Sequence, residues 1–196
     1  MKRRALLAAG GAGIATLTAG CNVLAGEPVT LGEPTVERDD DGRESYRRYR
    51  HDGTTIAVVT VDQGRRHEDA GRFPLDFHLA HSDVLEQDTP NTVVQRFRLA
   101  VLAERGGGRP PAEIAIHPPG GENWPAVTFE TSDDSWTVLA AEGLEKAGLG
   151  EGTLTIETEV QPLDDPIDHV AVAFEARLAG GGTRYRIDDR FRFEPR

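Results

Sequence analysis

Histidine, serine and aspartate side chains that could take part in catalysis or metal binding gather between His78 and Asp83. Imidazoles bind transition metals, but two residues three apart on a regular strand, such as His78 and His81, point to opposite sides of a sheet. His81, Ser82 and Asp83 are consecutive, whereas a hydrolase relay needs these groups to converge from separate segments, and the sequence has no Gly-x-Ser-x-Gly turn. We therefore predict surface histidines, with no metal site, no cofactor and no enzymatic activity.

A second candidate is a row of arginines near the end of the chain that alternates with apolar residues, namely Arg184, Arg186, Arg190 and Arg192. Guanidinium groups on one face of a strand could bind an anionic glycan or a phosphate. They could equally form cross-strand ion pairs with Glu157, Glu159 and Glu175. We favour the ion pairs and keep the arginines as candidate ligand contacts.

Trp124 is a third candidate, in a loop rich in proline and glycine that runs from 117 to 125. An exposed indole there could stack on a sugar or a peptide. Because tryptophan carries a large apolar area, it could also cover the end of the core. We favour the cover on the core and keep Trp124 as a candidate ligand contact.

The amino terminus has the three parts of a secretory signal. Lys2, Arg3 and Arg4 give a positive start, an uncharged stretch follows from 5 to 19, and Gly20 and Cys21 end it. The uncharged stretch is shorter than the roughly 20 residues that span a bilayer. We predict a cleaved signal over residues 1–20 and no permanent transmembrane helix.

Two motifs within this segment carry a resemblance to a known class of protein. Arg3-Arg4-Ala5-Leu6-Leu7 is similar to the twin-arginine export signature, and Leu17-Thr18-Ala19-Gly20-Cys21 resembles a lipobox, with Thr18 where leucine is usual. Together they resemble twin-arginine-exported cell-surface lipoproteins of haloarchaea. The resemblance implies cleavage between Gly20 and Cys21, a lipid on Cys21, and attachment to the extracytoplasmic face of the membrane.

The amino-acid composition excludes some classes of partner and of metal site. The net charge is −11, and removal of residues 1–20, which contain three bases and no acid, leaves −14. This acidity argues against nucleic acid as a partner and, with Lys146 as the one lysine after cleavage, resembles the composition of halophilic proteins. Cys21 is the single cysteine, so an intrachain disulfide and a copper–thiolate site are excluded.

Alternation of apolar and polar residues predicts an all-β fold. Asp41-Gly42, Asp52-Gly53 and the glycines at 180–182 are hairpin-turn signals, and the segment from 56 to 61 is apolar on both faces, which predicts a central strand. The one helical candidate is 141–147. The expected strands are 29–38, 43–50, 54–62, 75–81, 92–103, 112–117, 126–131, 136–140, 153–161, 170–178 and 184–193. We predict an antiparallel β-sandwich, which could be immunoglobulin-like.

These observations predict three parts: a signal over 1–20, the lipidated Cys21 with a short tether over 21–28, and a β-sandwich domain over 29–196. Our leading functional hypothesis is a non-enzymatic surface module that binds an unidentified surface protein or glycan or has a structural role. The alternative is a binding protein for a small ligand or a metal ion, associated with a transporter.

Overall fold

The computed structural model describes residues 27–64, 72–81, 90–106, 112–117, 127–131, 136–148, 150–163 and 167–195. Within these ranges the strands form two six-stranded sheets. The predicted antiparallel β-sandwich is therefore confirmed. Among the described residues, no helix is long and apolar enough to cross a bilayer.

The first sheet, sheet A, contains strands from both ends of the described chain. In spatial order it consists of β1 (Val29–Thr30), β12 (Thr183–Phe193), β11 (His169–Gly180), β6 (Thr92–Glu104), β9 (Thr137–Glu142) and β8 (Val127–Thr131). Its neighbouring strands are antiparallel except for β1, which runs parallel to the start of β12.

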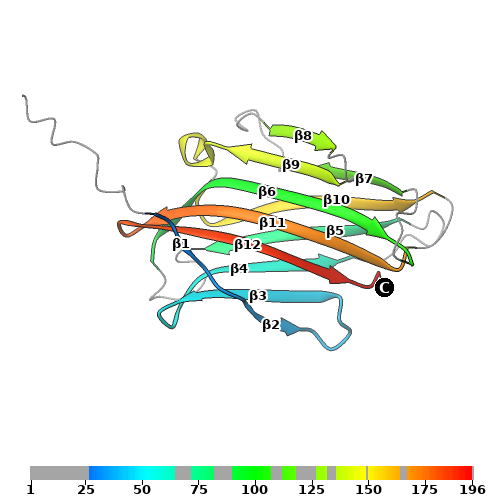
Figure 1. Ribbon diagram of the computed structural model, residues 1–196, viewed down its shortest axis with the longest axis horizontal. Helices are drawn as coiled ribbons and strands as arrows, with labels where there is room; N and C mark the ends of the chain where they lie inside the picture. The colour runs from blue at the N-terminus through cyan, green and yellow to red at the C-terminus, as the bar shows by residue number, and fades with distance from the viewer. Residues whose placement is uncertain are drawn as a thin grey trace, which may run out of the picture.

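The second sheet, sheet B, is entirely antiparallel. In spatial order it consists of β2 (Thr35–Arg38), β3 (Glu44–His51), β4 (Thr54–Gln63), β5 (Phe73–His81), β10 (Thr153–Pro162) and β7 (Ala112–His117). Strand β4 lies inside the sheet, as its apolar sequence on both faces predicts. Figure 1 shows β12, β11 and β6 of sheet A in front of sheet B, with β1 at one end of the molecule and the carboxyl terminus at the other.

The predicted hairpin turns are confirmed. Asp52 and Gly53 join β3 to β4 with φ values of 48° and 82°. Gly181 and Gly182 join β11 to β12 with φ values of 58° and 80°. Two positive φ angles in succession match the twist of the flanking strands, and glycine adopts them without the steric clash of a Cβ.

Two predicted elements need correction. The expected strand over 29–38 is two short strands in different sheets, because the chain crosses between the sheets around Gly32 and Pro34. The expected helix over 141–147 begins as strand, and only Leu144–Ala147 forms a 3₁₀ turn. Gly143 and Gly148 enclose this turn with left-handed φ values of 72° and 69°, so no room remains for a longer helix.

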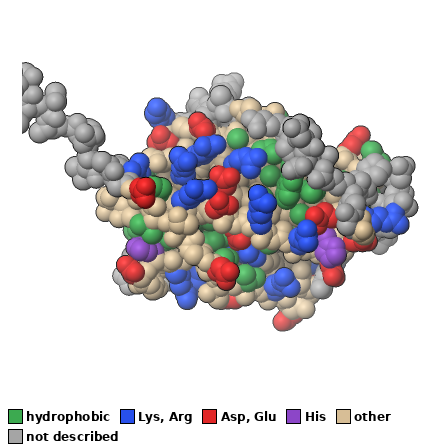
Figure 2. All heavy atoms as spheres, viewed as in Figure 1, with side chains coloured by type: hydrophobic (Ala, Val, Ile, Leu, Met, Phe, Trp, Pro, Cys, Tyr) green, Lys and Arg blue, Asp and Glu red, His purple; other side chains and the backbone are tan. Residues whose placement is uncertain are grey.

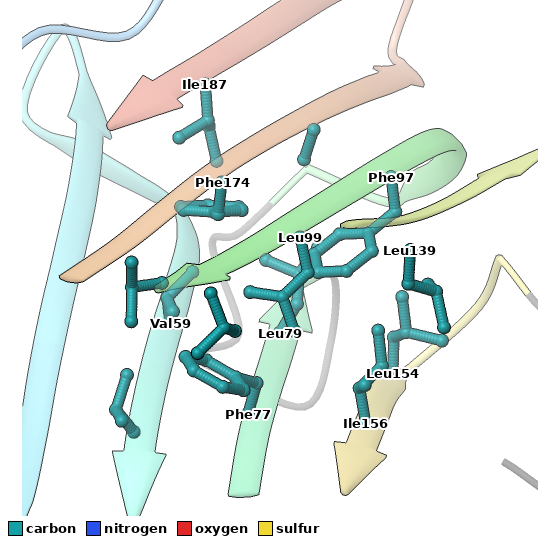
Figure 3. Close-up of a cluster of buried hydrophobic side chains, with 14 of the residues drawn as sticks. Val59, Phe77, Leu79, Phe97, Leu99, Leu139, Leu154, Ile156, Phe174 and Ile187 are labelled. Atoms are coloured by element: carbon teal, nitrogen blue, oxygen red, sulfur yellow. The ribbon is translucent and has the colours of Figure 1, made fainter. Parts of the chain in front are cut away.

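The core lies between the two sheets (Figure 3). Val59, Phe77 and Leu79 of sheet B face Leu99, Phe174 and Ile187 of sheet A, and all six are at most 3 % exposed. Burial of each such side chain contributes about 1.5–3 kcal/mol. This apolar contact fixes how the polar residues at the ends of the same strands meet.

Candidate functional site

Several of the predicted site residues lie outside the described residues. They are Arg3, Arg4, Gly20, Cys21 and Trp124. Ser82 and Asp83 also lie outside the described residues. The candidate site is therefore built from the remaining residues of the two sheets.

The histidines of β5 are separated by the pleat of the strand, as predicted. His78 is half-buried and its Nδ1 lies 3.0 Å from Oγ1 of Thr155, whereas Nδ1 of His81 lies 3.1 Å from Oγ1 of Thr92 on the opposite face. The prediction of surface histidines is wrong for His81, which is 1 % exposed because it occupies an inward position of the strand. In the described ranges, no three histidine, aspartate, glutamate or cysteine side chains come together as metal ligands.

The arginine row lies on the outer face of β12, as the alternation predicts. Glu157 and Glu159 belong to β10 in the other sheet, and Glu175 lies opposite Asp188, so the predicted ion pairs with these glutamates are wrong. These three partners could not be read from the sequence because it does not specify which strands are neighbours.

The observed partners of the row are other carboxylates. Arg192 binds Glu104 through two nitrogen–oxygen contacts of 2.8 and 3.0 Å, across the intervening β11. Arg186 binds Asp188 at 2.8 Å on the same strand. Figure 2 shows basic and acidic side chains intermingled on the face in view, without one continuous basic patch.

A cavity of about 470 Å³ opens between the two sheets, where β12 ends and the turn between β2 and β3 begins. We call it the end pocket. Sheet B contributes Arg38, Ser45, Arg47, Val61 and Gln63, and the turn between β2 and β3 contributes Gly42 and Arg43. Sheet A contributes His169, Phe191, Arg192 and Phe193, and Glu194 follows β12. Its volume lies within the range of about 300–1,000 Å³ that is usual for small-molecule sites.

The end pocket exists because the inward-facing rows of the sandwich change from apolar to polar at this end. On β3, the phase that buries Tyr49 also turns Arg47 and Ser45 inward. On β12, the phase that buries Ile187 also turns Asp189 inward. The positive charge of Arg47 and the negative charge of Asp189 therefore lie between the sheets. Leucine or valine at these inward positions would extend the apolar core instead.

Arg47 and Asp189 form an ion pair between the two sheets. Nε and Nη2 of Arg47 each lie 2.8 Å from Oδ2 of Asp189, and the Tyr49 hydroxyl donates to the same oxygen at 2.6 Å. The side chains of Arg47 and Asp189 are 11 % and 14 % exposed. The Arg47 guanidinium also lies 4.2 Å from the centre of the Phe191 ring, a cation–π distance. These contacts position the Arg47 side chain at the inner wall of the end pocket.

The rim of the end pocket is looser than its inner wall. Arg43 approaches Asp41 at 3.7 Å, and Nε2 of His169 lies 4.0 Å from Glu194, which is an ion pair only when the imidazole is protonated. Arg38 is exposed and forms no ion pair with any residue in the described part of the chain. Arg38 is thus the guanidinium of the pocket that is available to a ligand.

Sequence reasoning missed Arg47 and Asp189 as site residues. The signal that could have found them is a charged residue at an inward position of an alternating strand: Asp189 stands between Ile187 and Phe191 in the apolar phase of β12. Arg47 occupies the matching position two residues before the buried Tyr49. Charges of opposite sign at inward positions of two strands predict an ion pair between sheets.

A family model described as a domain of unknown function, DUF8121, matches residues 29–196. The chain belongs to this family. The DUF8121 match begins at the first residue of β1 and includes every residue of the end pocket. No curated protein matches the chain in a sequence comparison.

Solved structures share parts of the DUF8121 sandwich at low similarity. The collagen-binding domain of a Staphylococcus aureus adhesin has 8 % identity and a TM-score of 0.34, covering 67 % of this chain and 97 % of that one. The GAE domain of GGA2p from Saccharomyces cerevisiae has 6 % identity and a TM-score of 0.31, covering 83 % and 99 %. The collagen-binding subdomain of the Enterococcus faecalis surface protein ACE has 8 % identity and a TM-score of 0.30, covering 59 % and 88 %. At these values the likeness carries no argument about ligand or partner.

Proposed function

We propose that this protein is a lipoprotein on the extracytoplasmic face of the membrane, exported by the twin-arginine route and anchored through Cys21. Its sandwich is a non-enzymatic binding module, and the end pocket is its binding site. The sequence motifs around Arg3-Arg4 and Gly20-Cys21 support the proposed export route and membrane attachment. The observation that supports the binding role is that the end pocket lies far from β1, the strand at which the described chain enters the sandwich.

The end pocket and the entry point lie at opposite ends of β12. Val29 and Thr30 pair with Tyr185 and Arg186, whereas the pocket is lined by residues 191–194. Phe193 lies seven positions after Arg186 on β12, about 23 Å at ~3.3 Å per residue. Figure 1 shows β1 and the carboxyl terminus at opposite ends of the molecule. A tether that precedes β1 would therefore hold the pocket away from the membrane and open to ligands outside the cell.

The anchor is tested by Cys21→Ser in cells that express the full chain. We expect the wild-type protein in the membrane fraction with a lipidated amino-terminal cysteine by mass spectrometry. The variant should be secreted into the medium or keep its signal. A wild-type mature terminus at another residue, or an unmodified Cys21, overturns the anchor.

The orientation is tested by single-cysteine labelling, since Cys21 is the only cysteine and a lipid blocks its sulfur. Asp40→Cys places an exposed thiol beside the end pocket, and Gly32→Cys places one near the entry point. A membrane-impermeant maleimide should label the Asp40→Cys protein in intact cells at least as fast as the Gly32→Cys protein. Labelling of Asp40→Cys only after lysis contradicts the proposal.

The size of the end pocket also favours the second candidate, a binding protein that delivers a small ligand to a transporter. A cavity of about 470 Å³ holds a small molecule rather than a protein surface. Affinity purification of the detergent-solubilised anchored protein distinguishes the two roles. A permease that co-purifies in stoichiometric amount supports delivery, and its absence supports a module that acts alone.

A further inference from the structure

We propose that the end pocket binds a small organic acid that carries one carboxylate on a ring-shaped body. This inference rests on the proposed binding role of the pocket and names the chemical class of its ligand. The carboxylate would lie at the rim beside Arg38, and the ring would lie deeper, against the phenylalanines of β12.

We infer a carboxylate on the ligand from which arginines of the pocket already have a carboxylate partner. Arg47 and Arg192 are each held by a carboxylate at 2.8 Å, so their hydrogen-bonding edges are engaged. Arg43 is 3.7 Å from Asp41, beyond a strong hydrogen bond, and Arg38 has no ion pair with a described residue. A planar guanidinium binds a carboxylate through two parallel hydrogen bonds, and the guanidinium of Arg38 is open for such a pair at the rim.

The charges around the pocket disfavour a ligand with more than one negative charge. Asp41, Glu104 and Asp189 are the carboxylate partners of Arg43, Arg192 and Arg47, so Arg38 is the one arginine of the pocket lining that has no carboxylate partner among the described residues. Glu194 also lines the pocket and would repel a second negative group. A phosphate dianion or a polyanionic chain is therefore a poor match, and a monocarboxylate is a good one.

We infer a ring-shaped body for the ligand from the apolar residues that line the pocket. Phe191 and Phe193 are half-buried and face the pocket together with the buried Val61. Flat aromatic surface binds a second flat or ring-shaped apolar face. The Arg47 guanidinium lies over the Phe191 ring in a cation–π contact, which leaves the Phe193 side chain and the rest of Phe191 for the ligand. Two chemical sources share these features: an aromatic carboxylic acid and a sugar acid.

The experiment measures dissociation constants of the wild-type mature protein by calorimetry at one fixed high ionic strength. Benzoate is compared with the neutral benzamide, and glucuronate with the neutral glucose, which separates the two sources. Acetate tests the need for a ring, and inorganic phosphate tests the limit to one charge. We expect benzoate or glucuronate to bind at least about tenfold more tightly than its neutral partner, because a hydrogen-bonded charge pair is worth about 1.5–3 kcal/mol.

Arg38→Gln is the matched variant, since this exposed side chain has no role in the core. It should weaken binding of the preferred acid about tenfold or more. The control is Arg50→Gln, another exposed arginine of sheet B that lies outside the pocket, and it should leave binding within about twofold.

The proposal is overturned if neither acid binds more tightly than its neutral partner, if acetate or phosphate binds as tightly as the preferred acid, or if Arg38→Gln binds as tightly as wild type. None of these outcomes affects the labelling of Asp40→Cys in intact cells. Failure of the ligand class is therefore distinguishable from failure of the proposed surface role.

Discussion

The hydroxyl of Tyr49 lies 2.6 Å from Oδ2 of Asp189, although the two residues come from opposite sheets and are 140 positions apart. Burial, and then the hydrogen bond to Asp189 and the negative charge of that carboxylate, raise the pKa of Tyr49. Tyr49 also packs edge-on against Phe174 at 6.1 Å between ring centres. Tyr49 thus belongs to the apolar core and also contacts the ion pair that Asp189 forms with Arg47, a residue of the end pocket.

Tyr49→Phe should lower the free energy of unfolding by about 1.5 kcal/mol, because it removes a hydrogen bond to a charged group and leaves the ring in place. Tyr185→Phe is the control: Tyr185 is buried on β12 and its hydroxyl has no hydrogen bond to a described residue. Denaturant titration at pH 7 measures both. Equal effects of the two variants would contradict a specific role for the Tyr49 hydroxyl.

The same tyrosine should make the protein sensitive to alkali. The unfolded Tyr49 ionises near its ordinary pKa of 10.0, whereas the folded one keeps its proton to higher pH. Above pH 10 the unfolded state therefore binds fewer protons, and the free energy of unfolding falls as pH rises. Unfolding curves between pH 8 and about 11 should show a steeper decline for wild type than for Tyr49→Phe.

Asp189→Asn should destabilise the fold by about 2–3 kcal/mol. Removing one partner of a fully buried ion pair costs about 3–5 kcal/mol, and the slight exposure of Arg47 and Asp189 reduces this figure. Asp188→Asn is the matched control because its carboxylate lies next in sequence on the exposed outer face, where a pair is worth about 0–1 kcal/mol. A thermal midpoint equal in both variants would show that the pair between the sheets does not stabilise the sandwich.

A row of carboxylates crosses the outer face of sheet B. Glu44 lies opposite Asp62, Asp62 opposite Asp76, and Asp76 opposite Glu157. Burial raises the pKa of Asp76, with further increases from Glu157 and Asp62 and an opposing effect of His78. Because the folded pKa lies above the unfolded value of 3.8, the folded state binds more protons there, and stability rises as the pH falls toward that window.

Asp76→Asn should therefore stabilise the protein at neutral pH, by a few tenths to about 1 kcal/mol in low salt and by less in molar salt, where the repulsion is screened. Glu151→Gln, at an exposed position with no ion pair to a described residue, should change stability by less than about 0.5 kcal/mol. Thermal melts of both variants at two salt concentrations make the comparison. A destabilised Asp76→Asn protein would mean that this carboxylate has a favourable partner.

The mature protein should lose stability as salt is removed. The Debye length grows from about 3 Å at 1 M to about 30 Å at 0.01 M, so acids that are screened from one another in brine begin to repel. Circular dichroism melts from about 3 M to 0.05 M potassium chloride should show a falling midpoint. A midpoint that stays level or rises on dilution would mean that the acidity is unrelated to salt.

Export should depend on guanidinium pairs rather than on positive charge alone. Arg3→Lys together with Arg4→Lys keeps the charge of the amino terminus, and we expect the precursor to accumulate in the cytoplasm. Immunoblotting of cytoplasmic and membrane fractions measures this. Normal export of the double variant would refute the twin-arginine route and leave the lipid on Cys21 as a separate question.

The sequence by itself determined most of the strands and the β3–β4 and β11–β12 hairpins, because both depend on local interactions. Strict alternation placed Tyr185 and Ile187 inward and Arg184 and Arg186 outward, as the structure has them. The turn dipeptides fixed the β3–β4 hairpin through the positive φ angles of Asp52 and Gly53. Alternation does not distinguish a strand that changes sheets from one that does not, so 29–38 was predicted as a single strand.

Only the tertiary structure decided which strands are neighbours and which polar residues meet. The pairing of β6 with both β11 and β9, and of β1 with β12, joins segments that are far apart in the chain. Such pairing depends on how the inward side chains of two whole sheets pack, which no local window of sequence contains. Arg47 and Asp189 are 142 positions apart and meet only because the core beside them sets the register of one sheet on the other. The end pocket follows from that register.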